Sequence, residues 1–143
     1  MTDLTTLARE VFAHDLYATE LTGIAIESVE PDKVVCSLAL DSHHRNAKGA
    51  VMGGAIFTLA DFAFAIAANI DALNVSNKAD QVRLQWVSSS STIHFLAQAK
   101  GDKLTATTST VKKGHSQSLI QISVTDSLTR QIALVTTTGT KID

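Results

Sequence analysis

The chain has 143 residues, the length of one ordinary domain, and 45% of them are apolar while 18% are charged. This balance excludes an intrinsically disordered chain, and a domain of this length forms a core without a disulfide or a bound metal. Twelve Lys and Arg residues against 14 Asp and Glu give a formal charge of −2. The sequence therefore lacks the overall basic field of a nucleic-acid binder.

Cysteine usage and hydropathy bear on the cellular location. Cys36 is the one cysteine in the sequence, so neither an internal disulfide nor a cysteine zinc site is expected. The first ten residues lack the apolar stretch of a signal peptide. The most apolar segment, 55–70, is too short to span a bilayer and contains Asp61. We expect a cytoplasmic protein that binds no membrane and needs no metal or other cofactor.

The chain begins with signals for a short helix and a hairpin. Asp3 is suitably placed to cap a helix over the first dozen residues, where apolar residues recur near helical spacing. Residues 21–28 and 33–40 alternate in the manner of strands, and the turn between them contains Pro31 and acidic residues. With no linker-like segment and no internal repeat, the sequence predicts a single domain over residues 1–143.

A polar loop and a long apolar helix come next. Residues 41–50 are polar, and their two adjacent histidines, His43 and His44, are expected in solvent. The segment 55–69 is rich in alanine and apolar almost all round, which predicts a helix buried by other elements. Residues 70–80 are expected to form a surface loop.

The second half of the chain predicts strands. Apolar residues alternate with Thr, Ser and Gln, and turn signals interrupt the pattern at Gly101 and Gly114. The connections are short, so the strands are expected to pair antiparallel. An antiparallel sheet around one buried helix is an α+β layer fold. The four expected strands are residues 81–98, 103–112, 116–125 and 131–141.

Asp61 is the most informative residue, because it is ionisable and lies in the middle of the apolar helix. Burying a carboxylate is costly unless the group is paired or hydrogen-bonded. One interpretation is a structural carboxylate that binds a loop backbone or a second subunit. The other is a catalytic base or nucleophile that its dry surroundings keep reactive.

Gly53 and Gly54 precede the same helix and favour an anion site. The free N–H groups and positive dipole end of a helix N-terminus stabilise an oxyanion, and glycine lets a ligand approach closely. Gly53 and Asp61 are separated by eight positions, or about 12 Å along the axis, so one carbonyl cannot contact both. If both serve one reaction, two copies of the helix must lie antiparallel in a two-fold dimer.

The stretch from Asn46 to Ala63, with Gly53, Gly54 and Asp61 in it, resembles the signature of the hotdog-fold acyl-CoA thioesterases of the phenylacetate-pathway and 4-hydroxybenzoyl-CoA type. The later segments 93–106 and 111–115 are also similar to that family. The resemblance implies a hotdog fold, in which an antiparallel sheet of about six strands wraps round one central helix. It also implies a homodimer or homotetramer.

Site residues follow from the resemblance by position. It implies that Asp61 is the catalytic carboxylate, that Gly53 is the backbone oxyanion donor, with Gly54 beside it, and that Asn46 helps to place the thioester or the attacking water. The positions where the family often contacts the pantetheine and phosphates of CoA are Lys113, Gly114 and His115.

Two further positions are candidates for substrate contact. Met52 stands where the family pattern has a histidine that orients the thioester, which is the one clear departure from that pattern. Thr58 lies one turn before Asp61 on the helix and is placed to hold its carboxylate.

The expected function is hydrolysis of an acyl-CoA thioester to the free acid and CoA. The alternative is a non-catalytic acyl-CoA binding module of the same fold, in which Met52 marks the loss of hydrolysis. A hydratase or dehydratase is a third class. It is disfavoured because such enzymes usually pair a histidine with the acid, and Met52 removes that histidine.

Overall fold

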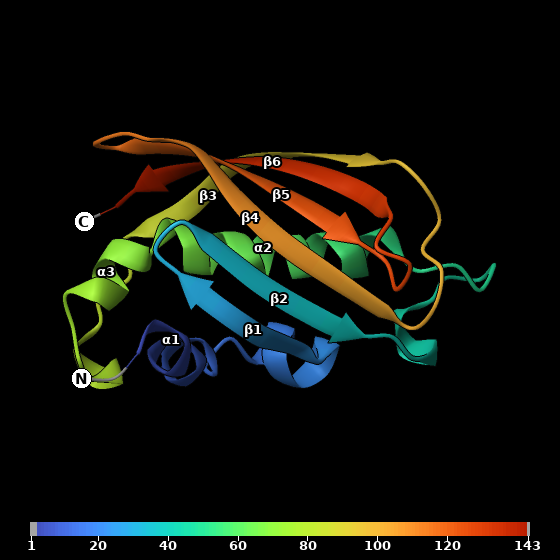
Figure 1. Cartoon of the computed structure of the whole chain (residues 1–143), viewed down its shortest axis with the longest axis horizontal. Helices are drawn as coiled ribbons and strands as arrows, with labels where there is room; N and C mark the ends of the chain where they lie inside the picture. Colours follow the sequence, from blue (N-terminus) through green and yellow to red (C-terminus); the bar gives the residue numbers. More distant parts are fainter. Residues whose placement is uncertain (1–2, 143) are drawn as a thin grey trace.

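Six strands form one antiparallel sheet in the computed structural model, which describes residues 3–142 (Figure 1). The spatial order is β1-β2-β4-β5-β6-β3, so β1 and β3 are the two edge strands. The terminal residues 1, 2 and 143 of the expected domain lie outside the described part. The strands are β1 (Ile24–Glu30), β2 (Lys33–Ala39), β3 (Trp86–Phe95), β4 (Lys103–Lys113), β5 (Gln117–Thr125) and β6 (Gln131–Lys141).

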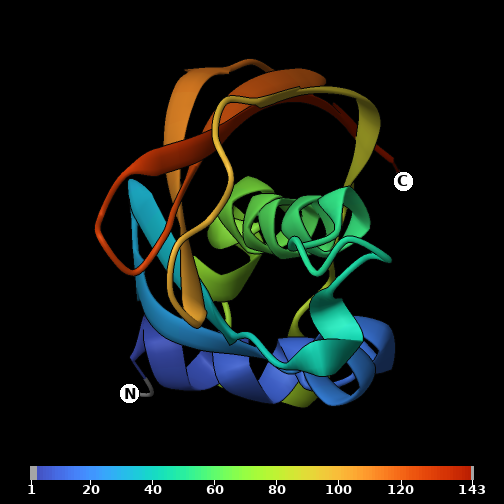
Figure 2. The same ribbon diagram turned by 90° about the vertical axis from the view of Figure 1, so that its right-hand side faces the viewer.

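The long helix α2 (Gly53–Ala68) lies against the concave face of the sheet. Figure 2 looks along this helix and shows the sheet curving around it. Nine of its sixteen residues are buried, because strands of the sheet pack on it from several directions. The α+β class and the hotdog arrangement expected from the sequence are confirmed. The helix begins at Gly53 rather than at Ala55, since Met52 is its N-cap.

An N-terminal layer packs below β1 and α2 and consists of α1 (Leu4–Phe12) and the π-helical turn η1 (Tyr17–Thr22) (Figure 1). Asp3 caps α1 as expected, since its carboxylate accepts a hydrogen bond of 2.9 Å from the N–H of Thr6. The ring of Phe12 meets that of Phe62 edge to face, with centroids 6.0 Å apart. This contact joins the end of α1 to the middle of α2.

The expected strand over residues 21–28 is wrong at its start. Leu21 and Thr22 belong to η1, and Gly23 ends that turn with a φ of +92°, a conformation that favours glycine. Its N–H donates to the carbonyl of Ala18. Strand β1 therefore begins at Ile24, because Gly23 reverses the backbone one residue earlier.

The expected surface loop over residues 70–80 is also wrong. It contains the short helix α3 (Ile70–Asn74) and the turn η3 (Ala79–Gln81). Ile70 and Leu73 are buried, and their three-residue spacing puts them on one helical face. The expected strand over 81–98 shortens to β3 at 86–95, because residues 82–85 and 96–98 have no strand pairing.

The buried side chain of Asn69 links the end of α2 to the start of β3 by hydrogen bonds. Its Nδ2 donates to the carbonyls of Ala65 and Trp86, while its Oδ1 accepts from the N–H groups of Gln85 and Trp86. These four hydrogen bonds use both donors and both acceptor lone pairs of the amide. The expected helix end at residue 69 is thus one residue too late, since Asn69 serves as its C-cap.

Strand β3 is an exposed edge that pairs with β6 alone. The polar residues 88–92 of this strand are exposed, as expected from their Ser and Thr content. Among residues 3–142, no helix has the length and apolar character needed to cross a membrane.

Candidate functional site

Helix α2 is covered on all sides except one. At 100° per residue, six of its seven incompletely buried residues fall within an arc of about 140°, and Asp61 lies near the centre of that arc. An otherwise buried helix thus presents its one ionisable residue through an open stripe. We call this set the open stripe: Gly53, Gly54, Phe57, Thr58, Asp61 and Ala65; Ala55 is the seventh residue.

The Asp61 carboxylate faces a cavity of about 290 Å³ between α2 and the N-terminal layer. Within residues 3–142 it takes part in no hydrogen bond and no ion pair. Burial raises its pKa, and the charge of Asp15 raises it further. A structural carboxylate that binds a loop of its own chain is therefore not what the structure shows. The half-buried group keeps its lone pairs free.

The start of α2 leaves two neighbouring N–H groups without a partner in the described chain. Ala55 and Ile56 both turn their N–H groups to the carbonyl of Met52, at 3.0 and 3.3 Å. The N–H of Met52 donates to the carbonyl of His44 at 2.8 Å. Gly53 and Gly54 remain, and their N–H groups point out of the helix end. This arrangement suits a developing negative charge.

The two glycines have different surroundings. A Cβ added at Gly53 would come within 2.9 Å of the Phe95 ring at the end of β3, whereas one added at Gly54 would meet no atom within 4 Å. A side chain at Gly53 would therefore have to displace the exposed Phe95 ring, whereas Gly54 is open to a ligand. Both flank cavities, since Gly53 lines one of about 660 Å³ and Gly54 lines one of about 250 Å³.

The expected exposure of both histidines is correct for His43 and wrong for His44, which is buried. The Nδ1 of His44 accepts from the N–H of Asp41 at 3.0 Å, so its Nε2 carries the proton and donates to the carbonyl of Thr22 at 2.7 Å. Both ring nitrogens are used, and the ring is neutral. His44 therefore ties the loop before α2 to η1 and positions the Met52 backbone.

Asn46 organises the loop that leads into α2. Its Oδ1 accepts from the N–H groups of Lys48 and Ala50, at 3.0 and 3.1 Å. The oxygen is therefore engaged, while the Nδ2 protons have no partner within residues 3–142. Asn46 is exposed on the loop that borders the cavity at Gly53.

Thr58 and Met52 lie beside the open N-terminus. The Thr58 hydroxyl donates to the carbonyl of Gly54 at 2.8 Å, so its single proton is not given to Asp61 in this structure. The expected hydrogen bond from Thr58 to the Asp61 carboxylate is therefore not formed, although both residues line the same cavity. Met52 is 54% exposed and lines the adjoining cavity with Gly54 and Thr58.

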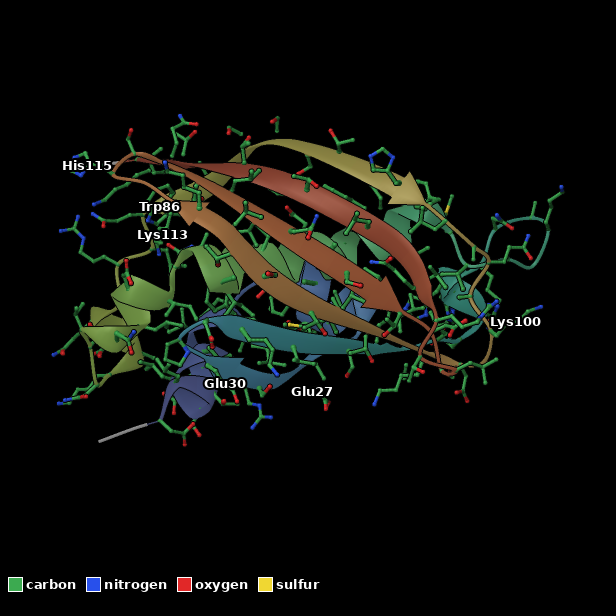
Figure 3. All side chains as sticks on the ribbon, turned by 45° about the horizontal axis from the view of Figure 1, so that its top comes forward. Glu27, Glu30, Trp86, Lys100, Lys113 and His115 are labelled. Carbon is green, nitrogen blue, oxygen red and sulfur yellow. The ribbon has the colours of Figure 1, made fainter. Side chains whose placement is uncertain are left out.

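Lys113, Gly114 and His115 gather at the other end of α2, around a cavity of about 320 Å³. The Lys113 ammonium pairs with Asp71 at 3.2 Å and donates to the carbonyl of Ala68 at 3.3 Å. Figure 3 shows His115 and Lys113 at one end of the sheet beside Trp86, and Lys100 at the far end. Because α2 is about 22 Å long between Gly53 and Ala68, these residues do not reach the Gly53 end of their own chain.

Sequence reasoning missed several residues around the site. Arg45 and Lys48 line the cavity at Gly53, and Asp15 and Tyr17 line the one at Asp61. Arg45 and Lys48 can be recognised in the sequence as two basic residues in the loop before the helix. Asp15 carries no local signal, because it reaches Asp61 only through the packing of the N-terminal layer on α2.

The chain's single thiol does not supply a nucleophile. Cys36 is fully buried in β2, and burial followed by the charge of Glu27 raises its pKa to about 12. It stays protonated at neutral pH.

Comparison with known proteins places the site in a family. The family model described as the thioesterase superfamily matches residues 48–133, which is more than half of the chain. The chain belongs to the thioesterase superfamily. The match includes Gly53, Gly54 and Asp61, and it leaves out Asn46 and the N-terminal layer.

Individual proteins agree with this assignment. The Escherichia coli PaaI protein, from the phenylacetic acid degradation operon, is 26% identical, with a TM-score of 0.79 over 99% of this chain and 97% of its own. A Haemophilus influenzae thioesterase shares the fold at 17% identity and a TM-score of 0.74, over 88% of this chain and 82% of its own. A Deinococcus radiodurans protein, named an esterase by inference, is 28% identical over 82% of this chain and 73% of its own. These likenesses support thioester hydrolysis in general.

Proposed function

We propose that this member of the thioesterase superfamily hydrolyses acyl-CoA thioesters to the free acid and CoA. The observation that carries the proposal is the position of Asp61, a carboxylate near the centre of the open stripe that has no hydrogen bond to any residue from 3 to 142. A group left free in a half-buried position is costly unless it acts on a ligand. The two N–H groups at the start of the same helix supply the electrostatic partner that thioester hydrolysis requires.

The proposal includes a two-fold dimer. Within one chain Gly53 and Asp61 are about 12 Å apart along α2, too far for one carbonyl to contact both. If two open stripes face each other antiparallel, Gly53 of one subunit lies opposite the partner's Asp61, and two sites form. Such a dimer can pair further into a tetramer. The proposed protein is a single cytoplasmic domain that works without a cofactor.

The chemistry follows from these positions. The N–H groups of Gly53 and Gly54 bind the thioester oxygen as it becomes negatively charged. The partner's Asp61 either takes a proton from a water that attacks the carbonyl carbon or attacks that carbon itself. The C–S bond then breaks and CoA leaves as a thiolate, which takes up a proton. In the second route, water afterwards hydrolyses the acyl-aspartyl anhydride.

The CoA portion has two places of suitable chemistry in such a dimer. The cavity of about 660 Å³ beside Gly53 has Arg45 and Lys48 on its wall, and these cations suit phosphates. In the antiparallel arrangement the C-terminal end of the partner's α2 lies about 10 Å beyond Gly53, since Ala68 follows Asp61 by seven residues. This brings Lys113 of the partner subunit toward the same end and supports the role that the resemblance implies for Lys113, Gly114 and His115.

A non-catalytic acyl-CoA binding module is the second candidate, and the specific observation in its favour is Met52. Its thioether cannot donate a hydrogen bond to a thioester carbonyl as a histidine can. The backbone donors at Gly53 and Gly54 remain regardless of this side chain. Hydrolysis is therefore the better-supported function.

The test is a hydrolysis screen over aryl-, short- and long-chain acyl-CoAs, with Asp61→Asn as the diagnostic variant. The amide keeps the shape of the carboxylate but neither accepts a proton nor attacks, so we expect kcat to fall by about 100- to 10,000-fold. The melting temperature should stay the same or rise, because a half-buried charge is removed. Asp32→Asn, in the exposed β1–β2 turn, is the matched control.

Two outcomes would contradict the proposal. Near-normal hydrolysis by a well-folded Asp61→Asn protein would assign the base to another residue. Tight acyl-CoA binding by the natural protein without any hydrolysis would favour the binding module.

A further inference from the structure

We infer that Asp15 is a positioning residue for the reaction: it lines the same cavity as Asp61, and its negative charge acts on the Asp61 carboxylate. The inference rests on the proposed function, because it assigns an electrostatic role at the same site. Asp15 lies in the connection between α1 and η1 and is separated from Asp61 by 46 positions in the sequence.

The exposed Asp15 and the half-buried Asp61 line the same cavity of about 290 Å³. Its other walls are Leu16, Tyr17, Ala18, Thr58, Phe62 and Ala65. None of these lining residues from the same chain is a cation. Because Asp61 is half-buried, water screens the charge of Asp15 less than it would between two fully exposed carboxylates.

The backbone of Asp15 is hydrogen-bonded at both its N–H and its carbonyl, which fixes the position of this residue in the N-terminal layer. Its N–H donates to the carbonyl of Phe12 at 3.1 Å, and its carbonyl accepts from the N–H and the hydroxyl of Thr19, both at 3.0 Å. Phe12 in turn packs edge to face on Phe62, the residue after Asp61. This aromatic contact holds the segment between α1 and η1, which contains Asp15, against the part of α2 that contains Asp61.

The pKa values of both acids respond to burial and to neighbouring charges. Burial raises the pKa of Asp15, and the adjacent His14 opposes that rise. Burial also raises the pKa of Asp61, and the negative charge of Asp15 adds to this effect. Asp61 therefore accepts a proton more readily than an isolated aspartate does.

Other titratable groups near the cavity are few. Tyr17 lines it from η1, and Glu20 lies one turn further along the same element. The adjoining cavity contains His43 and His44, of which His44 is neutral with both ring nitrogens engaged. His43 is exposed and pairs with Asp41 at 3.2 Å. Among residues 3–142 of one chain, Asp15 is thus the one other carboxylate that lines the Asp61 cavity.

The experiment compares Asp15→Asn and Asp15→Glu with the natural protein, using kcat and KM across pH and a ¹³C NMR titration of the Asp61 carboxyl carbon. In Asp15→Asn we expect the Asp61 resonance and the acid limb of kcat to titrate at lower pH. The plateau kcat should fall several-fold at nearly constant KM, because Asp61 becomes a weaker base. Asp15→Glu retains the charge and should restore the natural profile. Asp32→Asn serves again as the exposed control.

The outcomes separate this inference from the proposed function. If Asp61→Asn abolishes hydrolysis while Asp15→Asn leaves both titrations unchanged, Asp15 has no electrostatic role and only the inference fails. If Asp61→Asn remains active, the proposed function fails, but the NMR titration still reports whether Asp15 acts on Asp61. Equal loss of activity in Asp15→Asn and Asp15→Glu, with an unmoved titration, would indicate a packing role.

Discussion

Met52 combines a backbone role with an open side chain. Its N–H binds the carbonyl of His44 and its carbonyl binds the first turn of α2, so the backbone is fixed whatever the side chain. The side chain itself is half exposed beside Gly54. A substitution at this position therefore changes the surroundings of a bound thioester without changing the backbone donors.

Met52→His tests this separation. The imidazole would add one polar contact beside an unchanged helix N-terminus, so we expect kcat/KM to change by a factor equivalent to about 1–3 kcal/mol. Steady-state kinetics on the best acyl-CoA substrate measures the change. If the natural protein shows no hydrolysis and the variant acquires it, the natural chain is the binding module.

Asp126 shows how a carboxylate becomes structural, in contrast to Asp61. It is buried in the turn before β6, and its oxygens accept from the N–H groups of Lys100, Leu128 and Arg130 and from the Arg130 guanidinium. Burial alone would raise its pKa, but these hydrogen bonds outweigh that effect and lower it to about 2. Asp126 ties the β3–β4 connection to the β5–β6 turn.

Asp126 therefore makes stability depend on pH in the acid range. Because its pKa is lower in the folded than in the unfolded chain, its contribution is present above about pH 4 and is lost as the pH falls toward 2. We expect Asp126→Asn to be less stable than the natural protein at neutral pH, with the difference shrinking over that range. Urea unfolding at several pH values checks this. A difference that is constant with pH would contradict the assigned linkage.

At the scale of elements, Asn69 connects helix and sheet. Asn69→Ala leaves the N–H of Trp86 and the carbonyl of Ala65 without their side-chain partner in a largely buried region. Unsatisfied buried groups are costly, and we expect a loss of about 3 kcal/mol in the free energy of unfolding. Urea denaturation measures it, with Asn74→Ala at the exposed end of α3 as the control. A loss no larger than in the control would show that water replaces the amide.

The same scale shows which elements can be predicted from the sequence. Strands β4, β5 and β6 alternate cleanly, so their bounds fall within about two residues of expectation. The start of β1 and the helix α3 were missed. In both places the local pattern is short and polar residues interrupt it. Gly23 at the end of η1 sets the start of β1, and the packing of Ile70 and Leu73 against the core forms α3.

At the scale of the molecule, the proposed two-fold dimer makes a complementation prediction. Asp61→Asn and Gly53→Val should each be inactive alone, the first because it lacks the carboxylate and the second because its side chain would obstruct the approach of a thioester to the Gly53 N–H. A mixed dimer contains one site in which both residues are natural, so co-refolding equal amounts should restore about a quarter of the natural number of sites. Hydrolysis by the mixture, compared with each variant alone, measures this. A mixture as inactive as its components would show that Gly53 and Asp61 do not share a site across subunits.

The sequence by itself determined the layers of this protein and the residues of its candidate site that lie on one helix. A fully apolar helix requires a sheet around it, and an aspartate inside such a helix is conspicuous because a buried charge is costly. Gly53, Gly54 and Asp61 were therefore visible without coordinates. The tertiary structure decided what lies around them. Asp15 lines the same cavity as Asp61 because Phe12 packs on Phe62. His44 is buried and donates a hydrogen bond to the carbonyl of Thr22 in η1. Such contacts join residues far apart in the chain, where no local periodicity carries a signal.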